Sequence, residues 1–228
     1  MTDSVKWGPF KRSWAIALIV AAVLSPFLIT AALVMAFGPD EEPVSGLPGR
    51  PDAPTRTSFN VIGLPPVQTD PCPTPAQQLP QPVTGKNALP DLTLECIGAI
   101  GSSQTVQMNR LGGVPTVVNI WSTSCEPCKR EMPDLQRVHE QAAGKLRILG
   151  VNSNDYAEGA RVTIRNTGIS FASVADPDEL FRPAIGSALM PTTLFVSAEG
   201  RIVHRKVGQF VDEADLRSDI AEHLGVQL

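Results

Sequence analysis

Two cysteines with two residues between them, Cys125 and Cys128, form the stretch of this sequence best suited to chemistry. A C-x-x-C pair can cycle between a dithiol and a disulfide, or it can supply half of a zinc site. A zinc site needs two further Cys or His ligands at suitable spacing. The other cysteines, Cys72 and Cys96, are far apart in the sequence, and the three histidines do not cluster. The spacing therefore favours a redox-active disulfide and predicts neither a metal nor any other cofactor.

The residues around the pair indicate how it is positioned. A β-branched, apolar run at 117–121 predicts a short buried strand. After the pair, apolar residues recur at helical spacing, which predicts an amphipathic helix; these are Met132, Leu135, Val138 and Ala142. Cys125 then lies where a strand ends and a helix begins, and the helix N-terminus favours its thiolate as the nucleophile. Cys128, one turn later, is placed to resolve the mixed disulfide.

The rest of the C-terminal half predicts alternating strands and helices. Strands are expected at 92–97, 105–108, 147–152, 171–175, 193–197 and 202–207, and further helices at 158–167, 180–185 and 211–224. Asp212 is a candidate N-cap for the last helix. Strands that alternate with helices and end in a hairpin plus a helix predict an α/β domain with a mixed sheet, over residues 89–228.

The N-terminal part predicts an anchor and a spacer. Residues 1–13 are short and polar, and 14–37 contain no charged residue. Because about 20 apolar residues span a bilayer, 14–37 is expected to be a transmembrane helix. Basic residues precede it and acidic residues follow, so the N-terminus is expected in the cytoplasm and the remainder outside, at the cell membrane. A cleaved signal peptide is the alternative, and it exports the chain too.

Residues 38–88 are rich in proline and lack apolar periodicity, which indicates an extended extracytoplasmic linker. The formal charge of the whole chain is −4 and its pI about 5.4. This acidic balance argues against a nucleic-acid partner.

The run W-S-T-S-C-E-P-C-K-R-E-M-P, with M-P-T-T downstream, resembles the thioredoxin superfamily. Within it, the chain resembles the membrane-anchored, extracytoplasmic thiol–disulfide oxidoreductases of the ResA and TlpA type. The resemblance implies a thioredoxin fold with an additional N-terminal β-hairpin. It also implies reduction of oxidised cysteines in exported proteins, often apocytochrome c during cytochrome c maturation, with electrons from a transmembrane thiol donor.

The resemblance also assigns roles to single residues. Cys125 corresponds to the attacking cysteine and Cys128 to the resolving one. Pro191 corresponds to a cis-proline that faces the dithiol and exposes backbone for a substrate strand. Its neighbours Met190 and Thr192 are expected to bind substrate with it, and so is Trp121, which corresponds to the family tryptophan although a core role alone would explain it.

Glu131 resembles a glutamate near the dithiol of ResA-type proteins. We expect it to take the proton from Cys128, although a solvated helix position is the ordinary fate of a glutamate. Two departures bear on this site: Ser124 stands where the family usually has tryptophan, and Asn119 stands where thioredoxin has a buried acid. Because asparagine cannot act as a base, Glu131 is the stronger candidate for that role.

Cys72 and Cys96 are expected to pair, since an even cysteine count in an exported protein suggests disulfides. Such a bond would pin the end of the linker against the sheet. An electron relay to Cys125–Cys128 is the functional alternative, but no local motif activates either thiol.

Three functions remain open: a disulfide reductase, a disulfide-forming oxidase, and a membrane-tethered binding module without enzymatic activity. A dithiol at a helix start argues against the third. Glu126 places negative charge beside Cys125 and should oppose the thiolate, which favours a reductase over an oxidase.

Overall fold

The computed structural model describes residues 67–98 and 104–228, which belong to one compact unit, Ile62–Leu228. The predicted cytoplasmic segment 1–13 and transmembrane helix 14–37 lie outside the described residues, as do positions 38–66 of the linker. In the two described ranges, every helix is too short or too polar to cross a membrane.

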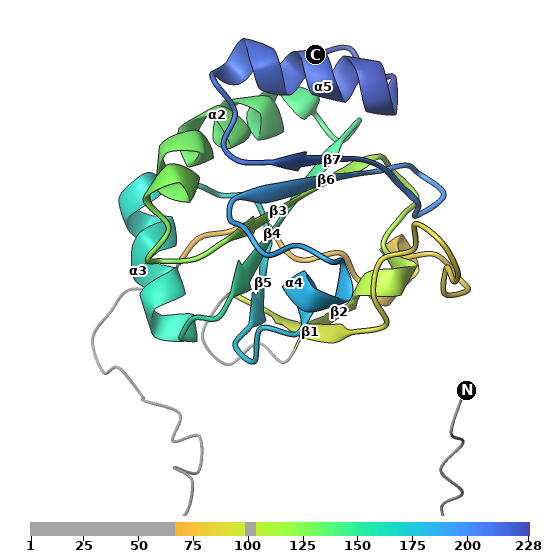
Figure 1. Cartoon of the computed structure of the whole chain (residues 1–228), viewed down its shortest axis with the longest axis horizontal. Coiled ribbons are helices and arrows are strands. Elements are labelled where there is room, and N and C mark those ends of the chain that lie inside the picture. The colour runs from red at the N-terminus through yellow and green to blue at the C-terminus, as the bar shows by residue number, and fades with distance from the viewer. Residues whose placement is uncertain (1–66, 99–103) are drawn as a thin grey trace, which may run out of the picture. The chain divides into compact units, whose positions relative to one another are not determined.

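A seven-stranded mixed sheet forms the centre of the unit, in the order β2-β1-β5-β4-β3-β6-β7 (Figure 1). The pairs β3–β4 and β4–β5 are parallel, and the other neighbours are antiparallel. The β1–β2 pair is the expected N-terminal hairpin. The strands are β1 Thr93–Cys96, β2 Thr105–Gln107, β3 Thr116–Trp121, β4 Arg147–Ser153, β5 Ser173–Asp176, β6 Thr192–Val196 and β7 Ile202–Val207.

The helices follow the predicted order, with ends that differ by a few residues. Asp212 caps the last helix, as predicted: its side chain accepts a hydrogen bond from the backbone N–H of Asp215 at 2.9 Å. The helices are α2 Glu126–Ala142, α3 Ala157–Thr167, α4 Phe181–Ala184 and α5 Glu213–Leu224, with two short 3₁₀ turns, η1 Pro75–Gln77 and η2 Met108–Arg110.

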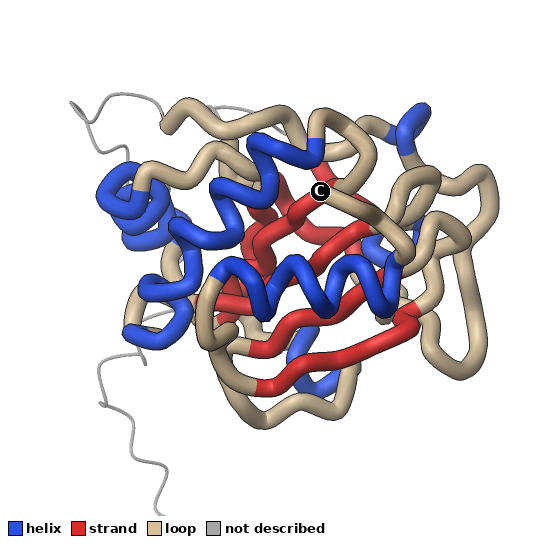
Figure 2. Tube along the Cα trace, turned by 90° about the horizontal axis from the view of Figure 1, so that it is seen from above, coloured by secondary structure: helices blue, strands red, loops and turns tan. Residues whose placement is uncertain are grey.

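Two hydrophobic cores lie on opposite faces of the sheet. The first contains the apolar stripes of α2, α3 and α5 against alternate residues of β3, such as Val117 and Trp121. The second contains the intervening β3 residues Val118 and Ile120, packed with α4 and the β1–β2 hairpin. Figure 2, viewed from above, shows helices lying over the strands. All six β3 residues are buried because the strand is covered on both faces.

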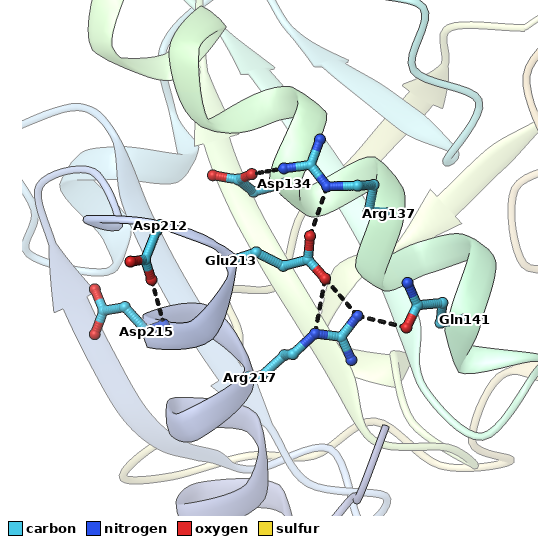
Figure 3. Close-up of polar contacts among 7 residues, drawn as sticks. All are labelled: Asp134, Arg137, Gln141, Asp212, Glu213, Asp215 and Arg217. Atoms are coloured by element: carbon cyan, nitrogen blue, oxygen red, sulfur yellow. Dashed lines mark hydrogen bonds and ion pairs between the residues drawn. The ribbon is translucent and has the colours of Figure 1, made fainter.

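Polar contacts between α2 and α5 fix the C-terminal helix in place (Figure 3). Glu213 accepts from Arg137 Nε at 2.5 Å and from the Arg217 guanidinium at 2.6 and 2.8 Å. Arg137 also pairs with Asp134, and Arg217 donates to Gln141 at 2.6 Å. The same interface therefore fixes the β7–α5 loop, in which the Phe210 backbone N–H donates to Glu131 of α2.

The predicted linker requires a correction at its C-terminal end, because residues 67–88 lie against the domain. Val67 and Cys72 are buried, and Cys72 forms a disulfide with Cys96. The backbone N–H of Leu79 donates to Arg110 O at 2.8 Å. Prolines remove helical and strand periodicity from the sequence, but an extended proline-rich segment can still pack against a surface.

Candidate dithiol site

Cys125 and Cys128 form a disulfide at the junction of β3 and α2. Cys125 is the N-cap of α2, and its sulfur accepts a hydrogen bond from the Cys128 backbone N–H at 3.2 Å. Cys128 is fully buried, whereas Cys125 retains 9% of its exposure. The sulfur of Cys125 is therefore the one that an external thiol or disulfide can reach. The positive end of the α2 helix dipole stabilises a thiolate at this position.

The loop before Cys125 is held by a residue from the next strand connection. Asp155 follows β4, and its carboxylate accepts from the Thr123 backbone N–H at 2.6 Å and from the Thr123 hydroxyl at 2.9 Å. The Cys125 N–H donates to Ser122 O at 3.2 Å, closing a turn. These bonds fix the direction from which Cys125 enters the helix.

The predicted cis peptide bond is present between Met190 and Pro191. Ile120 pairs with Thr192 across the β3–β6 ladder, so Pro191 lies level with the end of β3, close to where the dithiol loop starts. Pro191 O accepts from the Gly208 N–H at 2.9 Å. Met190 is partly buried and packs against the core that contains both cysteines.

Two predicted substrate-binding residues need correction. Trp121 and Thr192 are each fully buried. Trp121 belongs to the helix-covered core, and the Thr192 hydroxyl donates to Leu189 O at 2.7 Å. Because β3 and β6 are covered on both faces, both side chains lie in the interior beneath the dithiol and cis-proline loops. Neither side chain is exposed to a substrate.

Glu131 is the functional candidate with the most unusual environment. It is 2% exposed and lies one turn after Cys128 on the core-facing side of α2. Its Oε1 accepts from Asn119 Nδ2 at 2.7 Å and its Oε2 from the Phe210 backbone N–H at 3.1 Å. Burial raises the pKa of Glu131 from 4.5 to about 7, against the lowering effect of both hydrogen bonds. This places the carboxyl group in the range of a general base at neutral pH.

The sequence does not predict that Asn119 and Phe210 are hydrogen-bond partners of Glu131. Asn119 cannot act as a base, but its amide donates a hydrogen bond to the carboxylate of Glu131. The same amide nitrogen donates to Thr193 Oγ1 at 3.1 Å across the sheet. One available signal was an amide within an otherwise apolar buried strand, since a buried polar group needs a partner.

Glu126 does not act as an uncompensated charge. Its carboxylate pairs with Lys129 at 2.5 Å, and its side chain is 70% exposed. Solvent and Lys129 both weaken its repulsion of a Cys125 thiolate. The electrostatic argument for a reductase from Glu126 is correspondingly reduced.

The Cys72–Cys96 disulfide lies on the other face of the sheet. Cys72 belongs to the core beneath the hairpin, whereas Cys125 and Cys128 belong to the helix-covered core. Cys96 lies on β1 and pairs with Val174 of β5. In the sheet order, β5 and β4 both lie between β1 and β3. This placement supports a structural bond and not an electron relay. The described ranges contain no group of three or more His, Cys, Asp or Glu that could hold a metal ion.

Comparison with known proteins gives a consistent result. The Redoxin family profile matches residues 84–222. The chain is 28% identical over 111 residues to the thiol-disulfide oxidoreductase ResA of Halalkalibacterium halodurans, covering 48% of this chain and 63% of that protein. It is 30% identical over 137 residues to the thiol:disulfide interchange protein DsbE of Allochromatium vinosum, covering 58% and 71%.

Among solved structures, the chain resembles a secreted Mycobacterium tuberculosis disulfide oxidoreductase, with a TM-score of 0.51 and 18% identity over 58% of this chain and 96% of that one. At this identity the likeness establishes the thioredoxin-like fold alone. The match to ResA covers less than two thirds of that relative's length.

Proposed function

We propose that this chain, which belongs to the Redoxin family, is a thiol–disulfide oxidoreductase that reduces disulfides in exported proteins. One observation carries the proposal: an accessible Cys125 at a helix N-terminus, joined to a buried Cys128, beside a cis-proline and a buried carboxyl group. A dithiol with only a structural role needs neither the accessible sulfur nor the nearby titratable group.

The exchange follows from these positions. In the reduced protein, the Cys125 thiolate attacks one sulfur of the substrate disulfide, forms a mixed disulfide and releases one substrate thiolate, which takes up a proton. Cys128 then loses its proton to Glu131 and attacks the Cys125 sulfur. The second substrate thiolate leaves, and the Cys125–Cys128 disulfide forms. Two electrons have passed to the substrate, and a thiol donor restores the dithiol by the reverse exchange.

The cellular setting is part of the proposal. The uncharged run at 14–37 supports anchoring in the cell membrane, with the domain on the extracytoplasmic side. A membrane thiol carrier then supplies the electrons, and apocytochrome c is the proposed substrate by family resemblance.

The reduction potential of Cys125–Cys128 tests the direction of electron flow. We expect a potential well below that of the oxidant DsbA, about −120 mV, when the protein is equilibrated in glutathione or dithiothreitol buffers. A value near that of DsbA would favour a disulfide-forming oxidase. Cys128→Ser should accumulate a mixed disulfide through Cys125. A protein inert in both insulin reduction and thiol oxidation would instead be a binding module.

A further inference from the structure

Tyr156 is an aromatic side chain left almost fully in water. It is the single tyrosine of the chain and is 86% exposed. Its side chain therefore adds little to the packing of the domain. A large aromatic ring held at the surface is an efficient contact for a partner, because it offers apolar area and loses little conformational freedom on binding.

The sheet register places Tyr156 beside the dithiol. Trp121 of β3 pairs with Asn152 of β4 in the parallel ladder. Cys125 follows the first of these by four residues, and Tyr156 follows the second by four. Each is the N-cap of the helix that follows its strand, α2 or α3. Because parallel strands end at the same sheet edge, the two helix starts are neighbours there.

A direct bond joins the two loops. Asp155, the residue before Tyr156, binds both the backbone N–H and the hydroxyl of Thr123, two residues before Cys125. The same carboxylate accepts from Asn152 Nδ2 at 3.0 Å and from the Tyr156 N–H at 3.0 Å. The backbone of Tyr156 is thus fixed relative to the reacting cysteine, while its ring stays in solvent.

The opposite side of the dithiol also presents apolar side chains. Leu189, next to the cis-proline pair, is 62% exposed, and Val211 in the β7–α5 loop is 85% exposed. Ser124, which directly precedes Cys125, contributes no large side chain. The aromatic contact at this rim therefore comes from the β4–α3 connection and not from the dithiol loop itself.

We propose that Tyr156 is a specificity-determining residue that packs against an apolar side chain beside the reacting cysteine of an extended substrate segment. This inference rests on the proposed function, since the segment is held at the site by its mixed disulfide with Cys125. The occupant is a cysteine-containing segment of an exported protein with an aromatic or aliphatic neighbour. The Glu126–Lys129 pair beside the dithiol offers both signs of charge, so it gives no preference for a charged segment.

Two disulfide-bonded peptides that differ only in the residue next to the cysteine, Phe or Gly, test the proposal. The full-length reduced protein, Tyr156→Ala and Tyr156→Phe are compared by the second-order rate of peptide reduction. Val203→Ala, which alters an apolar side chain 49% exposed on β7, is the matched control. Oxidised glutathione, which lacks such a neighbour, measures the exchange chemistry separately.

We expect the wild type, Val203→Ala and Tyr156→Phe to prefer the Phe peptide by about three- to ten-fold, and Tyr156→Ala to lose that preference. The rates with glutathione should be equal in all four proteins. An unchanged preference in Tyr156→Ala would overturn the proposal. So would an equal loss with glutathione, which would mean that Tyr156 supports the loop and not the substrate. If the wild type reduced none of the three disulfides, the proposed function itself would fail, and this inference with it.

Discussion

Replacing Glu131 by glutamine is the most direct test of how the site handles protons. The substitution keeps the side-chain shape and one acceptor oxygen but removes the ionisable group. One of the two donors that face Glu131, Asn119 Nδ2 or the Phe210 N–H, then loses its acceptor. A buried donor left without an acceptor costs about 1–3 kcal/mol, which is less than the roughly 5–15 kcal/mol stability of a typical domain, so the variant should still fold.

The structure sets the size of the pH effect on stability. Burial raises the pKa of Glu131 from 4.5 to about 7, and such a shift corresponds to about 3 kcal/mol at 1.36 kcal/mol per pKa unit. Because the folded-state pKa is the higher one, the native state binds more protons between these values. The stability from neutral Glu131 is fully present below the ordinary pKa and is lost as pH rises through about 7. Glu131→Gln should lack this loss.

The exchange rate should respond in the opposite direction. Below its pKa, Glu131 carries a proton and cannot accept one from Cys128; above it, the carboxylate acts as the base. The wild-type rate should therefore rise through an inflection near pH 7. Glu131→Gln should lose that inflection and be slower above it by at least about ten-fold, a modest part of the 10²–10⁴ that general bases contribute.

Stopped-flow thiol exchange across pH measures the rates, and urea unfolding at about pH 5 and about pH 8 measures the linkage. Cys128→Ser, which lacks the resolving thiol, is the control for the first exchange step. Superimposable rate–pH curves for the wild type and Glu131→Gln would refute the general-base role. Equal pH slopes in the unfolding data would also refute the raised pKa.

Three further predictions concern the surroundings of this site. Asn119→Ala removes a hydrogen bond that lowers the pKa of Glu131, so the inflection of the rate–pH curve should move to higher pH in the same stopped-flow assay. Cys96→Ser opens a disulfide of sequence separation 24 and should cost about 3–4 kcal/mol in urea unfolding, while exchange with dithiothreitol stays unchanged. Hydrogen bonds from Arg137 and then from Arg217 lower the pKa of Glu213, so its contribution is present above the ordinary pKa and lost as pH falls through the lowered value; Glu213→Gln should flatten this acid-side loss of stability.

Local patterns predicted the parts of the site that lie close together in the sequence. The strand, the cysteine pair and the helix occupy one run of the chain, so hydrophobic periodicity was enough to place Cys125 at the helix start. The cis bond at Pro191 came from family resemblance, and composition alone does not separate it from a turn proline. The sequence predicts a linker over residues 38–88 because prolines remove apolar periodicity there, whereas residues 67–88 pack against the domain.

The environment of Glu131 could not be predicted in the same way, because it is assembled from distant segments. Spacing predicted that Glu131 and Cys128 share a helix face. The bond from the Phe210 N–H, however, joins positions 79 residues apart and depends on where the β7–α5 loop lies. Because the donor is a backbone N–H, no residue type in the sequence identifies it.

That loop is itself held by the helix that follows it, which links the C-terminal helix to the chemistry. Glu213, at the start of α5, is bound by Arg137 of α2, six residues after Glu131 on the same helix. Phe210 lies only three residues before Glu213, and its ring packs in the core with Phe195 at a centroid distance of 6.5 Å. Movement of α5 away from α2 would therefore withdraw the Phe210 N–H, which lowers the pKa of Glu131. Loss of this hydrogen bond raises the pKa of Glu131, whereas water admitted by the opened core lowers it. Movement of α5 would therefore change the pH at which Glu131 can accept the Cys128 proton, although no residue of the dithiol loop had changed.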